Sequence, residues 1–223
     1  MTEEVYGAVI FDMDGVIVHT ASQHFVAWRK LFAEMGRGLS EKEFRDIFGR
    51  RNQEILRHIL GDKLSEIQVE ELGQRKEVYY RDLMRGQVGA APGFMPLFDS
   101  LRDDEFKIAV GTSAPRQNVE LILSELGIRN QLDAVVTAED VTRGKPDPEV
   151  FLLAAQLCGV KPRRCVVFED AVAGIQAARA AGMKCVGAGK MDITQADLVV
   201  NGLDKVTTTI IRSLLDGTGR KGE

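Results

Sequence analysis

The stretch "AVIFDMDGVIVHT", Ala8 to Thr20, decides how the chain is interpreted. An apolar run ends in two aspartates, Asp12 and Asp14, which are separated by Met13 alone. In an extended chain, residues i and i+2 point the same way, so we expect both carboxylates on one side of a strand end. Two like charges so close together need a neutralising cation, and hard oxygen ligands favour Mg²⁺. Taken alone, the tetrapeptide that begins at Asp12 also fits a solvated turn, so the rest of the chain must distinguish a site from a turn.

Short apolar runs rich in valine and isoleucine alternate with helical patterns along most of the chain. Such near-continuous runs are typical of strands that are buried on both faces of a parallel sheet. The expected strands are 7–11, 107–112, 133–138, 165–169, 184–189 and 197–200. Three helical patterns, each ending in a glycine stop signal, lie between them at 115–127, 148–159 and 171–182. The alternation predicts a doubly wound, Rossmann-like α/β sheet with right-handed crossovers.

The interval between the first and second strands departs from this alternation, because it contains helical patterns and no strand pattern. Ser40 and Glu43 have the spacing of a capping box at the start of one of these helices. The helical patterns cover 21–35, 40–48, 52–60 and 65–85. We therefore predict an all-helical cap domain, residues 19–87, inserted into an α/β core that is made of residues 1–18 and 88–223.

Composition and charge exclude several classes of protein. The chain has 223 residues and a formal net charge of −4, so no global positive field attracts nucleic acid or an anionic membrane. No apolar run approaches the ~18 residues of a membrane span, and the N-terminus lacks the regions of a signal peptide. Cys165 and Cys185 sit in apolar runs, which favours reduced thiols in the core. We expect a cytoplasmic protein that binds neither nucleic acid nor membrane, with a monomer favoured over an oligomer.

Other expected strand ends carry polar side chains of complementary kinds. One strand ends in Glu169 and Asp170, and another ends in Thr112 and Ser113. Lys145 lies just before the start of an expected helix. Hydroxyl groups and lysine suit phosphate oxygens, whereas carboxylates suit a metal and acid–base chemistry. Each residue has an ordinary explanation as a helix cap or a surface charge, but their joint position at one sheet edge favours a site.

Four segments resemble the four motifs of the haloacid dehalogenase superfamily, in the order and spacing of its phosphatase and phosphomutase branch. They are "FDMDGV" (11–16), "GTS" (111–113), "GKPDP" (144–148) and "FEDAVAGIQAARAAGM" (168–183). The helical module after the first strand is similar to the small cap of that branch. The resemblance covers nearly the whole chain, and it implies a Mg²⁺-dependent enzyme whose partner is a small-molecule phosphoester.

The resemblance also implies a role for each polar strand end. Asp12 would be the nucleophile that forms an aspartyl-phosphate, and Asp14 would be the general acid and base. The transferring phosphoryl group would be bound by Thr112, with Ser113 beside it, and by Lys145. Mg²⁺ would be held by Asp12, the main-chain carbonyl of Asp14 and Asp170, with Glu169 nearby.

The cap decides between two activities within this branch. The segment 15–36 resembles the opening of the β-phosphoglucomutases, with Thr-Ala at 20–21, His24, and Ala-Trp at 27–28. Those mutases carry Gly-x-Ser-Arg to hold a second phosphate, whereas this chain has Gly-Arg-Arg-Asn at 49–52. Their second motif reads Ser-Ala-Ser, and here it reads Thr-Ser-Ala-Pro. We therefore predict a phosphatase that acts on a small phosphorylated metabolite, with a sugar-phosphate mutase as the alternative.

Closure of the cap is expected to bring polar side chains over the strand ends. The two chain crossings, at 17–20 and 86–91, are the expected hinges. The candidate substrate-binding residues of the cap are His24, Arg50, Arg51 and Lys76.

Two classes other than phosphoryl-transfer enzymes fit the sequence less well. A response-regulator receiver also has paired aspartates, but it needs a phospho-acceptor after its third strand and no helical insertion. A catalytically silent binding module on the same fold would not need both Asp12 and Asp14. Mg²⁺-dependent turnover of p-nitrophenyl phosphate separates an enzyme from either class.

Overall fold

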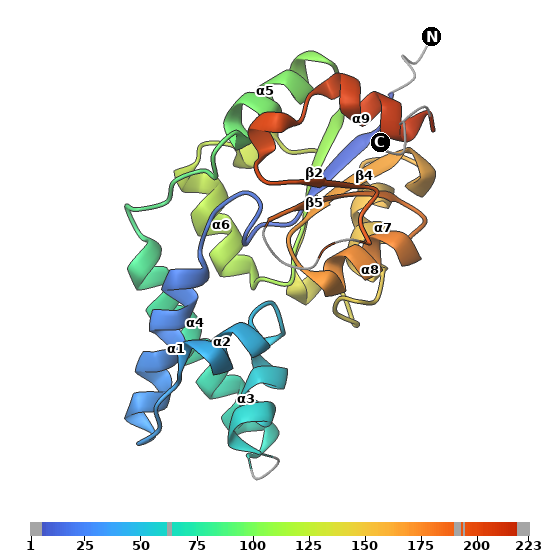
Figure 1. The fold of residues 1–223 in the computed structure, drawn as a ribbon. Helices are drawn as coiled ribbons and strands as arrows, with labels where there is room; N and C mark the ends of the chain where they lie inside the picture. The colour runs from blue at the N-terminus through green and yellow to red at the C-terminus, as the bar shows by residue number, and fades with distance from the viewer. Residues whose placement is uncertain (1–5, 62–63, 190–192, 194, 218–223) are drawn as a thin grey trace.

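The structure is a computed structural model, and it describes residues 6–61, 64–189, 193 and 195–217. Among these residues, a parallel sheet with the strand order β3-β2-β1-β4-β5-β6 forms the centre of the molecule (Figure 1). The strands are β1 (Ala8–Phe11), β2 (Lys107–Gly111), β3 (Ala134–Val136), β4 (Cys165–Glu169), β5 (Lys184–Ala188) and β6 (Leu198–Val200). All six predicted strands are confirmed, with shifts of one or two residues at their ends.

The strand order places β1 in the middle of the sheet, between β2 and β4. The chain runs outward from β1 through β2 to β3 and then returns to the other side of β1 as β4. Ligands of open α/β sheets bind at such a switch point, beyond the carboxyl ends of the strands. Phe11 pairs in register with Phe168, so the residues that follow them, Asp12 and Glu169, lie side by side at the carboxyl ends of β1 and β4.

Helices cover both faces of the sheet. One face carries α5 (Phe94–Asp103), α6 (Arg116–Glu125) and α9 (Thr208–Leu215), and the other carries α7 (Glu149–Leu157) and α8 (Val172–Ala180). Val9 and Phe11 point into the first layer, and Ala8 and Ile10 into the second, which explains why β1 is apolar throughout. Helices α6, α7 and α8 agree with the predicted helical patterns, whereas α5 and α9 were not predicted. Among the described residues, no helix combines the length and apolarity needed to cross a membrane.

Four helices between β1 and α5 lie together beyond one end of the sheet (Figure 1). They are α1 (Ala21–Glu34), α2 (Glu41–Ile47), α3 (Asn52–Leu60) and α4 (Glu66–Met84), and they agree with the predicted patterns. The predicted capping box is present, because the Ser40 side chain accepts from the Glu43 N–H while the Glu43 carboxylate accepts from the Ser40 N–H. These helices share an apolar cluster of their own that includes Trp28, Phe32 and Leu56.

The two chain segments that join the cap to the core run side by side. Val18 and Ala90 form an antiparallel bridge, and the Ala91 N–H donates to the Ile17 carbonyl oxygen at 2.7 Å. The two covalent connections between the cap and the core therefore form one narrow link.

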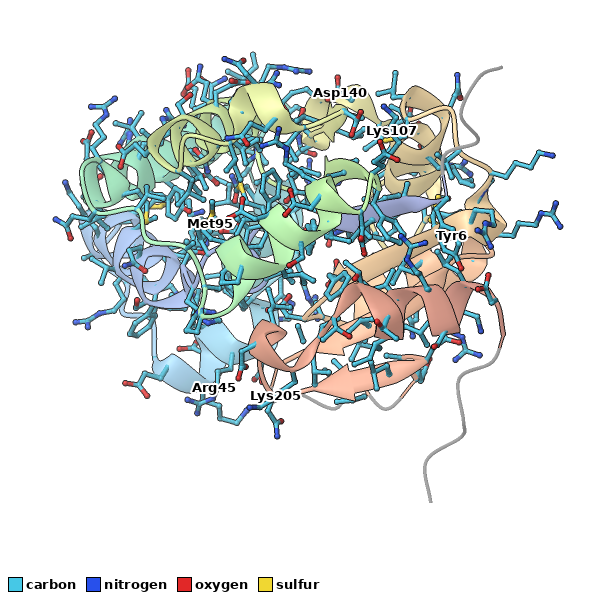
Figure 2. The ribbon with its side chains drawn as sticks, turned by 90° about the horizontal axis from the view of Figure 1, so that it is seen from above. Tyr6, Arg45, Met95, Lys107, Asp140 and Lys205 are labelled. Carbon is cyan, nitrogen blue, oxygen red and sulfur yellow. The ribbon has the colours of Figure 1, made fainter. Side chains whose placement is uncertain are left out.

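The start of the described chain is fastened to its last helix. Tyr6 lies beside α9, and its hydroxyl donates to the Asp216 carboxylate (Figure 2). The guanidinium groups of Arg164 and Arg212 lie 4.5 and 4.3 Å from the centre of the Tyr6 ring. These contacts hold α9 on the sheet at the end remote from the cap.

Candidate active site

Asp12 and Asp14 lie on a turn at the carboxyl end of β1. The Asp12 N–H donates to a carbonyl oxygen of β4 at 2.9 Å, which extends the pairing of the two strands. Met13 is fully buried between the two acids, as side-chain alternation requires. Gly15 follows with φ of +89°, and a side chain there would overlap with the Asp170 carboxylate. Glycine therefore allows the turn and Asp170 to approach each other.

Lys145 joins two carboxylates at this edge. Its Nζ lies 2.7 Å from Asp12 Oδ1 and 2.5 Å from Glu169 Oε1, and its side chain is 8% exposed. Burial alone would lower the pKa of Lys145, but Asp12 and Glu169 outweigh it and raise the pKa. The lysine is therefore a fixed positive charge beside both acids.

Three carboxylates form a cluster that suits a divalent cation. Ligand oxygens of Asp12, Glu169 and Asp170 lie within 4.8 Å of one another. Burial and the neighbouring carboxylates raise the pKa of Asp12 and of Asp170, because Lys145 balances only part of the negative charge. Carboxylate oxygens are ligands that Mg²⁺ prefers, so the donor set fits this ion.

Thr112 and Ser113 follow β2 at the same edge. Thr112 is 2% exposed, and its Oγ accepts a hydrogen bond from the Ala114 N–H at 3.1 Å. Because that bond uses an acceptor position, the Thr112 hydroxyl proton stays available to a substrate oxygen. Ser113 is half-buried and lines the adjoining cleft.

A cleft of about 960 Å³ lies between this edge and the cap. All the predicted site residues line this cleft, and their roles remain predictions. From the core these are Asp12, Asp14, Thr112, Ser113, Lys145, Glu169 and Asp170, and from the cap they are His24, Arg50, Arg51 and Lys76.

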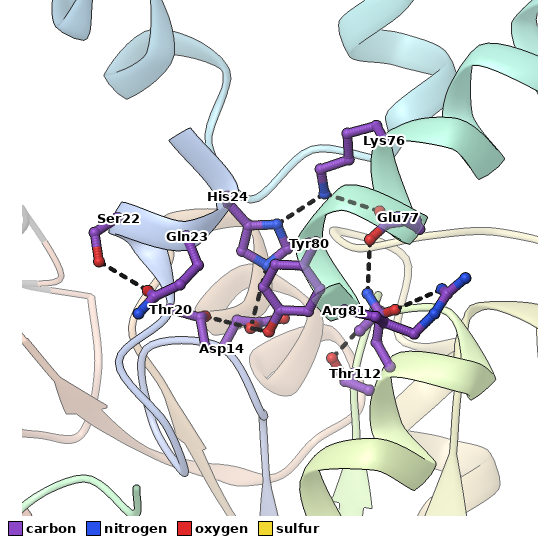
Figure 3. Close-up of polar contacts among 12 residues, drawn as sticks. Asp14, Thr20, Ser22, Gln23, His24, Lys76, Glu77, Tyr80, Arg81 and Thr112 are labelled. Atoms are coloured by element: carbon purple, nitrogen blue, oxygen red, sulfur yellow. Dashed lines mark hydrogen bonds and ion pairs between the residues drawn. The ribbon is translucent and has the colours of Figure 1, made fainter. Parts of the chain in front are cut away.

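The Asp14 carboxylate is held from the cap side (Figure 3). Its Oδ1 accepts a hydrogen bond from the Thr20 hydroxyl, and it lies 3.3 Å from His24 Nε2 and 3.4 Å from the Tyr80 hydroxyl. Lys76 Nζ lies 2.7 Å from His24 Nδ1. Since an ammonium group only donates, Nδ1 accepts and the ring proton on Nε2 faces Asp14. Burial alone would raise the pKa of Asp14, but His24, Thr20 and Lys76 together lower it.

Tyr80 was not among the predicted site residues, and no role was predicted for Thr20. Tyr80 is fully buried, and its ring stacks on His24 with centroids 4.0 Å apart and an interplanar angle of 12°. The spacing in the sequence did indicate Tyr80 as a site residue, because Tyr80 follows Lys76 by four residues on α4 and therefore lies on the same face of the helix.

The positively charged residues that were predicted in the cap differ in how many of their hydrogen-bond donors stay free for a substrate. Lys76 is 1% exposed, and its ammonium group is already bonded to two side chains. Arg50 is exposed where it lines the cleft. Arg51 packs against Gly144, on the loop that carries Lys145, and its buried Nε has no hydrogen-bond partner among the described residues. Arg51 thus brings a free donor from the cap to the loop of Lys145.

Comparison with known proteins matches the chain over most of its length. A family model described as haloacid dehalogenase-like hydrolase matches residues 6–182. The chain is 37% identical to fructose-1-phosphate phosphatase YqaB of Escherichia coli K12 over 185 residues, which cover 82% of this chain and 96% of that protein. It is 34% identical to the β-phosphoglucomutase of Bacillus subtilis over 212 residues, which cover 92% of this chain and 93% of that protein.

A solved structure shares both the sheet and the cap. The crystal structure of β-phosphoglucomutase from Clostridium difficile superposes with a TM-score of 0.88 at 30% identity, covering 96% of this chain and 99% of that chain. The match confirms the predicted fold class, an α/β sheet with an inserted helical cap. Because the family model spans well over half of the chain and the relatives align over nearly their whole length, the chain belongs to the haloacid dehalogenase-like hydrolases.

Proposed function

We propose that the protein is a Mg²⁺-dependent phosphatase that hydrolyses a small phosphorylated metabolite, such as a sugar phosphate, through an aspartyl-phosphate on Asp12. The observation that carries the proposal is the double ion pair of Lys145 with Asp12 and Glu169, at the edge where Asp14 and Asp170 also lie. It gathers a candidate nucleophile, a fixed cation, an acid–base group and a set of metal ligands around one end of the cleft. The E. coli relative that is named as a fructose-1-phosphate phosphatase supports the same reaction class.

Mg²⁺ would be held by Asp12, Asp170 and the main-chain carbonyl of Asp14, with Glu169 nearby. When bound, the ion supplies positive charge that stabilises the transferring phosphoryl group. Lys145 adds a second positive charge, and the hydroxyl of Thr112 adds a donor to the phosphoryl oxygens.

The two aspartates divide the chemistry between them. An Asp12 carboxylate oxygen attacks phosphorus, the bond to the leaving oxygen breaks, and Asp14 gives that oxygen a proton. In the second half, Asp14 takes a proton from a water molecule, whose oxygen attacks phosphorus and releases Asp12. Hydrogen bonds from Thr20 and His24 favour the ionised form of Asp14, which serves the second half directly, whereas the first half starts from an Asp14 that has taken up a proton.

A sugar-phosphate mutase is the second candidate, because the chain is 34% identical to the β-phosphoglucomutase of B. subtilis. A mutase must grip a second phosphate while its bisphosphate intermediate turns round. The position that carries arginine in the mutase pattern is Asn52 here, and its amide donates to Glu77 Oε1 at 2.7 Å. Because Asn52 is engaged in cap packing and carries no charge, the phosphatase is favoured.

The test is a panel of phosphorylated metabolites that is scored for inorganic phosphate in the presence of Mg²⁺. The panel includes fructose 1-phosphate and β-glucose 1-phosphate, the latter with and without glucose 1,6-bisphosphate. We expect phosphate release that chelation abolishes and that the bisphosphate does not stimulate. Formation of glucose 6-phosphate faster than phosphate release would identify a mutase instead. No turnover of any phosphomonoester, p-nitrophenyl phosphate included, would overturn both candidates.

A further inference from the structure

The side-chain amide of Asn118 joins the core to the cap. Asn118 lies in the first turn of core helix α6 and is fully buried. Its Nδ2 donates to Glu77 Oε2 at 2.7 Å, and its Oδ1 accepts from Arg81 Nη1 at 3.0 Å. Glu77 and Arg81 lie one turn apart on cap helix α4 (Figure 3). One core side chain is therefore bonded to two charged groups of the cap.

A neutral amide suits these two partners because it both donates and accepts. The Glu77 carboxylate only accepts and the Arg81 guanidinium only donates, so the orientation of the Asn118 amide is fixed by its neighbours. A carboxylate at position 118 would face Glu77 with a like charge. An apolar side chain there would remove a partner from both charged groups. The contact between α4 and α6 is therefore chemically selective.

Glu77 connects this bridge to the candidate acid–base group. Glu77 is 4% exposed, and its Oε1 accepts from Lys76 Nζ at 2.8 Å. The same ammonium group bonds to His24 Nδ1, and His24 Nε2 faces Asp14. A continuous set of hydrogen bonds thus leads from core helix α6 through the cap to the Asp14 carboxylate.

We propose that Asn118 is a positioning residue that couples docking of the cap on the core to the placement of Asp14. Asn118 belongs to the core and Glu77 to the cap, so their bond exists only while α4 lies against α6. With the bond made, Glu77 is held where its charge anchors Lys76 and, through it, His24. When the cap lifts, Glu77 loses a donor, and the set of hydrogen bonds loses its tie to α6. The inference rests on the proposed function, which gives Asp14 its work as acid and base.

The test exchanges the amide and the carboxylate of the Asn118–Glu77 hydrogen bond. Asn118→Asp places a carboxylate opposite Glu77. In the double variant, Asn118→Asp with Glu77→Gln, the new amide can donate to the new carboxylate while its oxygen still accepts from Lys76 and Asn52. Glu125→Gln is the matched control. Glu125 also joins α6 to the returning chain, through bonds of 3.0 Å from the Gly86 N–H, but no hydrogen bond leads from it to Asp14 in the described structure.

The readout is kcat/KM, which reports the first phosphoryl transfer, on two substrates. One is p-nitrophenyl phosphate, whose leaving group hardly needs a proton, and the other is the sugar phosphate that the wild type turns over fastest. General acid–base catalysis is typically worth about 10²–10⁴-fold, so a misplaced acid should cost at least about tenfold on the sugar phosphate. We expect Asn118→Asp to show that loss with less than about a twofold change on p-nitrophenyl phosphate. The double variant should recover most of the loss, and Glu125→Gln should change neither substrate by more than about twofold.

Equal losses on the two substrates, no loss, or no recovery in the double variant would overturn the inference. If Asn118→Asp does not fold, as judged by circular dichroism, Glu77→Gln is compared with the double variant instead. Glu77→Gln places a second amide opposite Asn118, so that a donor faces a donor where the carboxylate accepted before. This variant should therefore show the same selective loss. The double variant should again recover the activity. A wild type without Mg²⁺-dependent turnover contradicts the proposed function. An active wild type with equal losses contradicts only the role of Asn118.

Discussion

The carboxylate of Glu169 occupies the space that a side chain on Gly174 would need. Gly174 lies in the first turn of α8, and Glu169 turns back beneath that helix end to accept from the Ala171 N–H at 2.9 Å. The other Glu169 oxygen lies 2.5 Å from Lys145 Nζ. The glycine is therefore a condition for the ion pair at the sheet edge, because any larger residue would push the carboxylate away.

Gly174→Ala is expected to displace Glu169 and to weaken its bond with Lys145. Alanine normally stabilises a helix interior by roughly 0.5–1 kcal/mol relative to glycine, so a lower melting temperature here would reverse the ordinary effect. We expect that reversal, together with a loss of turnover of at least about tenfold, because small displacements at reacting groups are costly. Thermal unfolding and p-nitrophenyl phosphate turnover measure the two effects.

Gly73→Ala is the matched control for stability. Gly73 also lies within a helix, but a methyl group there would meet Asn52 Cβ at an ordinary 3.5 Å. The free energy of unfolding should stay the same or rise. A Gly174→Ala variant that behaves like this control would show that the Glu169 carboxylate is free to move.

Asp12→Asn tests the nucleophile. The amide keeps the size of the side chain but cannot attack phosphorus, so turnover should fall below a few per cent of the wild type. Burial and the neighbouring carboxylates raise the pKa of Asp12, so removal of its charge should not destabilise the fold. Activity is measured with p-nitrophenyl phosphate, and the melting temperature serves as the folding control.

Trapping of the wild type with BeF₃⁻ and Mg²⁺ gives an independent test of the same residue. The fluoroberyllate should be found on Asp12 by fluorine NMR or crystallography, and the Asp12→Asn variant should not bind it. Fluoroberyllate on another carboxylate, or an Asp12→Asn variant with substantial turnover, would exclude the nucleophilic role.

Asp14→Asn tests the division of labour between the two aspartates. If Asp14 supplies the proton, kcat/KM should fall by roughly 10²–10⁴-fold for sugar phosphates and by much less for p-nitrophenyl phosphate. The difference arises because p-nitrophenol is a good leaving group without a proton. An equal fall for both esters would assign Asp14 to metal positioning or to the turn rather than to acid–base catalysis.

The effect of Mg²⁺ on stability should grow with pH. Burial and the neighbouring carboxylates raise the pKa of Asp12 and Asp170, so the metal-free folded protein holds protons there that the unfolded chain releases at lower pH. Stability from this source is fully present below the ordinary carboxyl range and is lost as pH rises toward the raised values. Mg²⁺ must displace those protons, so its stabilising effect should be larger at about pH 8.5 than at about pH 6.

The measurement is the melting temperature with Mg²⁺ or with EDTA at both pH values. Asp170→Asn removes one of the two titrating ligands, so the pH dependence should become clearly smaller. A Mg²⁺-induced shift that is equal at the two values, or smaller at the higher one, would contradict the assignment of these carboxylates as ligands.

Much of the fold could be predicted because parallel strands and amphipathic helices have short repeats in the sequence. The proximity of Asp12 and Glu169 followed from the same reasoning, since the carboxyl ends of parallel strands share one edge. Helix α5 was not predicted because Pro96 lies in its first turn. Proline is tolerated there, although in a sequence it is usually a signal of a loop. Helix α9 was not predicted because it has only eight residues and stands next to a polar tail, although its apolar residues have helical spacing.

The side-chain contacts of the site were less accessible to the sequence. Asn118 gives no periodic sign of its bonds to Glu77 and Arg81, because these depend on how α4 lies across α6. The lysine of the third motif could be assigned to phosphate, but its ion pair with Glu169 depends on the pairing register of β1 with β4. Contacts between the cap and the core depend on how the two pack against each other. The apolar periodicity of single strands and helices does not determine that packing.

The bridge between Val18 and Ala90 brings the two ends of the cap segment next to each other. A segment whose ends meet can be replaced by another without stretching the host sheet, and this one also has an apolar cluster of its own. Grafting a cap from a relative between these two positions would therefore change which leaving groups can reach Asp12, while the strand that carries this aspartate stays as it is. Such an architecture lets specificity diverge by exchange of the whole segment, provided that the new cap supplies counterparts of Thr20, His24 and Tyr80 around Asp14.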